Sequence, residues 1–82
     1  MEFDVFVKSL MCKIQLYLGD EYEVDTVPAT KNNGVKLTGI IARKDGSRAF
    51  PTLYVDEHYN PDMDERDIEF LALKMSKVLK NA

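Results

Sequence analysis

The chain has 82 residues, 45% hydrophobic and 30% charged, which is the composition of an ordinary folded domain and excludes a disordered or low-complexity segment. A chain of this length buries somewhat more than about 60% of the surface that its unfolded form exposes. There is room for one core, so we expect a single domain over residues 1–82. Eleven basic against fourteen acidic residues give a net charge of −3, which disfavours direct binding to nucleic acid.

Cysteine content and the first eighteen residues bear on the cellular compartment. Cys12 is the only cysteine, so the chain can form neither an internal disulfide nor a thiolate metal cluster. Charged residues interrupt the apolar N-terminal stretch, and it has neither a basic leader nor a small-residue cleavage site. No uncharged run approaches the roughly eighteen residues that a spanning helix needs. We therefore expect a cytoplasmic protein with no membrane segment.

Hydrophobic periodicity predicts a helix over residues 3–18. Gly19 follows it, where a helix end favours a left-handed residue. The apolar positions at three-and-four spacing are Phe3, Phe6, Val7, Leu10, Met11, Ile14, Tyr17 and Leu18.

Alternating patterns after Gly19 predict three antiparallel strands. The alternating positions are Tyr22, Val24 and Thr26, then Val35, Leu37, Gly39 and Ile41, then Phe50, Leu53 and Val55. NNG at 32–34 and KDGS at 44–47 are the turn signals between them. Pro51 lacks a backbone donor, so the third strand should be an edge there or carry a bulge.

NPD at 60–62 ends the third strand. The apolar spacing that follows predicts a second helix over about 64–80, with Asp64 as its cap. Its apolar positions are Ile68, Leu71, Ala72, Met75, Val78 and Leu79. The element order predicts an α+β fold, α-β-β-β-α, in which a three-stranded antiparallel meander has both helices packed on one face.

Four segments carry a resemblance: EFDVFVK at 2–8, YLGDEY at 17–22, KNNGVKLTG at 31–39 and PTLYVDE at 51–57. Together they resemble the N-terminal part of an uncharacterised bacterial domain-of-unknown-function family, over roughly the first two-thirds of the chain. That family has no assigned activity, so the resemblance implies no catalytic residue and no cofactor. Its members are usually longer, which leaves open an independent small protein or one domain of a longer protein.

Seven carboxylates lie within residues 53–70, beside the single histidine, His58. A calcium loop starting at Asp56 fails, because His58 and Pro61 stand where it needs an oxygen ligand and a glycine. A site made from His58 with Asp56 or Glu57 has few ligands, so we expect no metal. The carboxylates at the start of the second helix complement its dipole and explain much of the cluster. They are Asp62, Asp64, Glu65 and Asp67.

Six carboxylates lie outside that explanation. They are Asp20, Glu21, Glu23 and Asp25 near the first strand, and Asp56 and Glu57 after the third. If the first and third strands lie on either side of the second, these residues could form an acidic partner-binding face for a basic groove of a nucleic-acid-handling enzyme. The simpler alternative is a solvated acidic surface that keeps a small protein soluble.

Both predicted helices carry apolar residues away from their core faces, at about 100° per residue. We expect these residues to form an apolar surface for a protein partner or a homodimer. They are Val5, Cys12 and Leu16 on the first helix, and Phe70 and Leu73 on the second.

The sequence contains no phosphate-binding glycine loop and no recognisable nucleophile with its base, so we do not expect an enzyme. The favoured expectation is a small acidic protein-interaction module. By analogy with small acidic bacterial and phage proteins, including anti-CRISPR proteins, it would inhibit a bacterial nucleic-acid-handling effector. The alternative is a structural or homo-oligomerisation domain of a longer bacterial protein. A small enzyme that uses Cys12 and His58 is the least favoured reading.

Overall fold

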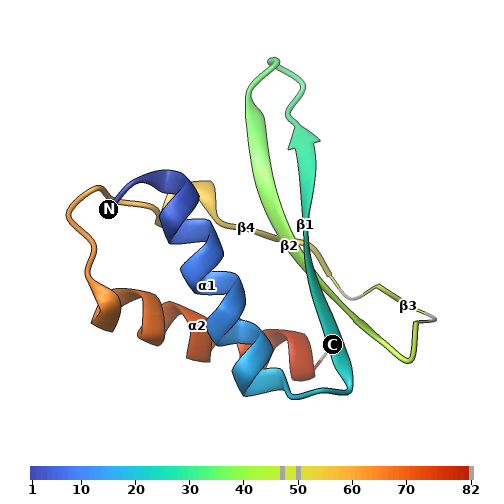
Figure 1. The fold of residues 1–82 in the computed structure, drawn as a ribbon. Coiled ribbons are helices and arrows are strands. Elements are labelled where there is room, and N and C mark those ends of the chain that lie inside the picture. Colours follow the sequence, from blue (N-terminus) through green and yellow to red (C-terminus); the bar gives the residue numbers. More distant parts are fainter. Residues whose placement is uncertain (47, 50, 82) are drawn as a thin grey trace.

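The computed structural model describes residues 1–46, 48–49 and 51–81. Its elements are α1 (Phe3–Leu18), β1 (Tyr22–Thr30), β2 (Lys36–Lys44), β3 (Arg48–Ala49), β4 (Leu53–Tyr54), the short 3-10 turn η1 (Asp56–His58) and α2 (Glu65–Lys80). The sheet is antiparallel and open, with β2 at its centre, β1 on one side, and β3 and β4 on the other (Figure 1). This arrangement confirms the predicted α+β fold and its α-β-β-β-α order.

The predicted third strand consists of two short pieces, β3 and β4. Both pair antiparallel with β2, and Tyr54 lies opposite Gly39. Pro51 lies between the two pieces, where it cannot donate a hydrogen bond to a neighbouring strand. Phe50, which the sequence assigns to the third strand, and Ser47, in the turn before it, lie outside the described residues.

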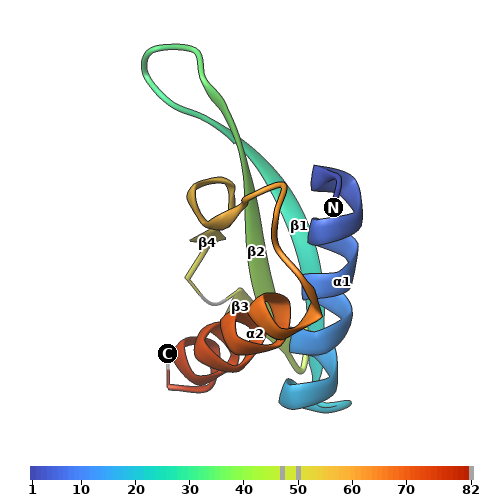
Figure 2. The ribbon, with the colours of Figure 1, turned by 90° about the vertical axis from the view of Figure 1, so that its left-hand side faces the viewer.

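Both helices pack on the same face of the sheet, as predicted (Figure 2). The buried cluster consists of Phe6, Leu10, Ile14 and Leu18 from α1, Ile40 and Ala42 from β2, Val55, and Ile68, Ala72, Met75 and Leu79 from α2. Val78, which the periodicity assigns to this core, is instead 47% exposed. It lies on the flank of α2 that faces β4, where no further element covers it within the described chain.

The core-facing side of β2 differs from the one that the alternation suggested. Ile40 and Ala42 belong to the buried cluster with the helices, whereas Gly39 and Ile41, at the alternate positions, lie on the other face, where Ile41 is also buried. Residues 37–42 read LTGIIA and are apolar or small at both parities, so a period of two does not decide which face is inside.

A capping box fixes the start of α2. The carboxylate of Asp64 accepts hydrogen bonds from the backbone N–H groups of Arg66 and Asp67, and the Asp67 carboxylate accepts one from the N–H of Asp64. The cap is therefore the residue that the sequence predicted, and the helix begins at Glu65.

The side chain of Gln15 covers part of the free edge of β1. Its Nε2 atom donates to the carbonyl of Tyr22 at 2.7 Å and to that of Gly19 at 3.1 Å. Its Oε1 atom accepts from the N–H of Val24 at 3.2 Å. Pro28, further along the same strand, has no N–H to offer. The edge of β1 is thus closed to a further strand over much of its length.

The β1–β2 hairpin projects beyond the helical layer (Figures 1 and 2). Its turn is held by a hydrogen bond from the N–H of Lys31 to the carbonyl of Val35 at 2.8 Å, and Gly34 takes the positive φ of 85° that this turn requires. Neither helix in the described part of the chain combines the length and apolarity needed to cross a bilayer.

Candidate functional site

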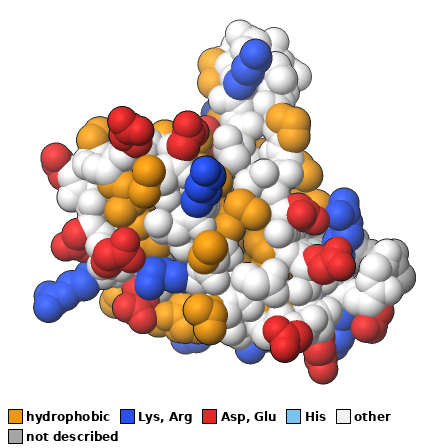
Figure 3. Space-filling model, in the orientation of Figure 1, with side chains coloured by type: hydrophobic (Ala, Val, Ile, Leu, Met, Phe, Trp, Pro, Cys, Tyr) orange, Lys and Arg blue, Asp and Glu red, His pale blue; other side chains and the backbone are white. Residues whose placement is uncertain are grey.

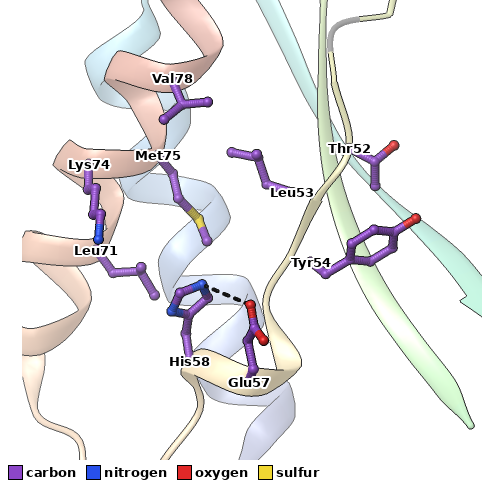
Figure 4. Close-up of a pocket in the computed structure, with 9 residues that line it drawn as sticks. All are labelled: Thr52, Leu53, Tyr54, Glu57, His58, Leu71, Lys74, Met75 and Val78. Carbon is purple, nitrogen blue, oxygen red and sulfur yellow. Dashed lines mark ion pairs between the residues drawn. The ribbon is translucent and has the colours of Figure 1, made fainter.

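A groove of about 240 Å³ lies between β4 and the C-terminal half of α2 (Figure 4). Leu53 on the strand side and Met75 and Val78 on the helix side point into the space between the two elements. The complete lining is Thr52, Leu53, Tyr54, Glu57, His58, Leu71, Lys74, Met75 and Val78. The walls are therefore largely apolar, with charged groups toward the rim.

Charge differs between the two sides of this groove. At the η1 end, Nε2 of His58 lies 3.9 Å from Oε1 of Glu57 (Figure 4). On the other side, the part of α2 beyond Phe70 contains no carboxylate and three lysines, of which Lys74 lines the groove. They are Lys74, Lys77 and Lys80. An acidic group that enters from the α2 side would meet a favourable charge.

The six carboxylates predicted as an acidic face lie at the two sides of β2, near β1 and after β4 respectively. Asp25 forms an ion pair with Arg43 at 3.1 Å, and Glu21 forms one with Lys44 at 3.6 Å. The carboxylate of Asp56 accepts from a backbone N–H of β2. Asp25, Glu21 and Asp56 are thus engaged within the chain, and Glu57 lies beside His58. The side chains of Asp20, Glu23 and Glu57 are exposed. Their action as one binding face stays a prediction.

All five residues of the predicted apolar surface lie at the surface of the protein. Leu16 and Phe70 are the most exposed, at 79% each. The others are Val5, Cys12 and Leu73. Figure 3 shows hydrophobic side chains reaching the surface of the helical layer beside acidic ones. Tyr54 is also exposed, because it lies opposite Gly39 on the outer face of the sheet. The exposure of Val78 could not be derived from the sequence, because it depends on how α2 lies beside β4.

Cys12 and His58 line different hollows. Cys12 lies on the outer side of α1 with Lys8, Lys13 and Leu16, whereas His58 lies in the groove beside α2. The fold therefore does not bring this thiol and imidazole into one pocket. Within residues 1–46, 48–49 and 51–81, no three side chains of the types His, Cys, Asp or Glu are grouped to hold a metal ion.

The two helices are joined by a hydrogen bond at their contact. The hydroxyl of Tyr17 donates to Oε1 of Glu69 at 2.8 Å. This bond raises the pKa of the Tyr17 phenol above its usual value, because it stabilises the protonated form. Leu16 and Phe70 are the chain neighbours of these two residues, so both exposed apolar side chains lie close to the junction of the helices.

The fold defines a small α+β domain with an open sheet. Residues 3–82 match a family of unknown function, DUF5688, and the chain belongs to that family. This match includes α2 and so extends past the first two-thirds of the chain that the four sequence segments cover. No curated protein and no solved structure matches the chain.

Proposed function

We propose that this protein is a non-catalytic protein-interaction module. The observation that carries the proposal is the 79% exposure of both Leu16 and Phe70, beside the Tyr17–Glu69 junction of the helices. Leaving apolar area in water costs about 25 cal/mol per Å², and burial against a partner recovers it. Exposed apolar patches on small soluble domains commonly mark sites of association.

The narrower part of the proposal concerns the partner. The partner would be a bacterial nucleic-acid-handling effector, which the protein would inhibit by occupying its basic groove. The net charge of −3 supports this proposal, because it complements a basic groove. The exposed Asp20, Glu23 and Glu57 would steer such an encounter. The comparison with anti-CRISPR proteins is an analogy of size and charge. A cytoplasmic location belongs to the same proposal, because the single Cys12 leaves the fold independent of disulfides.

Self-association is the second candidate. The exposed apolar residues occur on both helices, so a second copy that packs on the helical layer would cover Leu16 and Phe70 together with their neighbours. This arrangement would make the chain a structural or homo-oligomerisation domain.

The double variant Leu16→Glu with Phe70→Glu tests the proposal. Both side chains are exposed, so the fold should persist, while a buried carboxylate would oppose association. The matched control is Asn32→Glu with Asn81→Glu, which changes two other exposed positions by the same charge. Each immobilised protein is incubated with a cell lysate, and we expect the wild type and the control to retain a cellular protein that the double variant does not retain. Calorimetry with that purified protein then measures the three affinities. Equal retention by all three proteins would contradict the proposal.

A further inference from the structure

The two edge strands of the sheet differ in whether other groups cover their outward-facing backbone N–H and C=O groups. On β1, Gln15 occupies outward-facing backbone groups of Tyr22 and Val24, and Pro28 removes a donor further along. On the opposite side, β4 carries no such cover among the described residues, and the apolar groove lies directly beside it.

The register shows which backbone groups of this edge are available. Val55 donates its N–H to the carbonyl of Thr38 at 3.1 Å, so Val55 belongs to a hydrogen-bonded pair with β2. Bonded and non-bonded pairs alternate in an antiparallel ladder, so Tyr54, opposite Gly39, belongs to a non-bonded pair. The N–H and C=O of Tyr54 therefore point away from β2. Thr52, two residues earlier, has the same orientation by the period of the strand.

These outward-facing groups and the groove fit one kind of ligand. An added strand would bond to Thr52 and Tyr54, which lie about 6.6 Å apart along an extended chain. Its alternate side chains would point toward the helical layer, where Leu53, Met75 and Val78 line the groove (Figure 4). A volume of about 240 Å³ lies below the roughly 300 Å³ typical of small-molecule sites and suits a few side chains.

We propose that β4 and the groove beside it bind an extended segment of the partner protein, which adds to the sheet as a further strand. The segment places an apolar side chain among Leu53, Met75 and Val78, and a carboxylate two residues away that pairs with Lys74. This inference rests on the proposed interaction function and specifies the kind of partner segment. Main-chain bonds supply general affinity, and the apolar-x-acidic pattern supplies selectivity.

The test uses a displayed library of random nine-residue peptides, selected on the wild-type protein. Val78→Glu and Lys74→Glu alter the groove at exposed positions, and each has a matched control outside the groove. Val35→Glu makes the same substitution in the β1–β2 turn at an equally exposed side chain, and Lys77→Glu makes the same charge reversal on α2. The synthetic peptides are then methylated at one backbone nitrogen at a time, which removes single donors from the proposed ladder.

We expect enriched peptides with the apolar-x-acidic pattern. Val78→Glu and Lys74→Glu should weaken their binding about tenfold or more, and the controls should leave it unchanged. Methylation of the peptide amides that face β4, which are those of every second residue, should weaken binding similarly, and methylation of the amides between them should not. The amide hydrogen of Tyr54 should exchange with solvent more slowly when peptide is bound.

The opposing outcomes separate the inference from the proposed function. If binding depends on the groove but methylation of alternate peptide amides has the same effect at every position, strand addition is wrong, and the interaction function is still supported. Peptides that bind only through Leu16 and Phe70 would reject the groove as the site and still support that function. If no peptide is enriched, or if none depends on the groove, strand addition fails, and the retention experiment with Leu16→Glu and Phe70→Glu still decides the interaction function.

Discussion

The carboxylate of Asp56 accepts a hydrogen bond from the backbone N–H of Thr38 at 2.7 Å. In a continued ladder, this N–H would bond to the carbonyl of Val55, its opposite residue in the register. Asp56 therefore ends the pairing of β4 with β2 and ties η1 to the sheet. Glu57 and His58, which follow directly, are thereby positioned at the end of the groove.

Replacing Asp56 tests this structural role. Asp56→Ala leaves the partly buried N–H of Thr38 without its charged acceptor, so the free energy of unfolding should fall by about 1–2 kcal/mol. Glu57→Ala, at an exposed neighbouring carboxylate, should stay within about 0.5 kcal/mol of the wild type. Urea unfolding followed by circular dichroism measures both values. Equal effects of the two substitutions would show that Asp56 is only a surface charge.

Gln15 should be a sensitive position on α1. Gln15→Leu removes the side-chain bonds to Tyr22 and Val24, and should lower the free energy of unfolding by about 1–3 kcal/mol. Opening the edge of β1 should also promote association, visible as light scattering that rises with concentration. Leu16→Ala, at the exposed next residue, provides the control and should change stability by less than about 0.5 kcal/mol. An unaffected Gln15 variant would refute the role of this side chain in closing the edge.

Gly39 leaves space for the side chains of Thr52 and Val27 on the outer face of the sheet. A Cβ atom at this position would collide with Cγ2 of Thr52 and would lie 3.2 Å from Cγ2 of Val27. We expect Gly39→Ala to cost about 1–3 kcal/mol of stability. Thr52→Ser removes the colliding methyl group, so the double variant should recover much of that loss in a double-mutant cycle. Additive losses would place the strain elsewhere.

The Tyr17 phenol should titrate above its ordinary pKa of 10.0, because it donates to the Glu69 carboxylate. Since the folded-state pKa is the higher one, this contribution to stability is complete below pH 10.0 and is lost as the pH rises through the raised pKa. Absorbance of the phenolate during a pH titration measures the shift. Glu69→Gln should return the midpoint toward the ordinary value, and an unchanged midpoint would contradict the assignment.

Local sequence signals predicted the helices well, because periodicity and capping act over a few residues. The apolar spacing of residues 3–18 and the cap at Asp64 correspond to α1 and to the start of α2. The inner face of β2 could not be derived in this way, since LTGIIA offers apolar or small residues at both parities. The choice of Ile40 and Ala42 for the core follows from packing with the helices.

The groove beside β4 could not be predicted from the sequence for a similar reason. Val78 has the spacing of a core residue, and its exposure arises only because α2 stands beside an interrupted third strand. The role of Asp56 was also hidden, since its hydrogen bond joins positions eighteen residues apart. The exposure of Leu16 and Phe70, by contrast, was readable from helical geometry.

The most direct test of an interaction module for another protein is its own state of association. Size-exclusion chromatography with light scattering, from micromolar to near-millimolar protein, measures the molar mass of the wild type and of the double variant Leu16→Glu with Phe70→Glu. We predict a monomer of 9.4 kDa throughout, with the apolar surface free for a partner. A dimer that persists at micromolar concentration and dissociates in the double variant would contradict it and assign that surface to self-association.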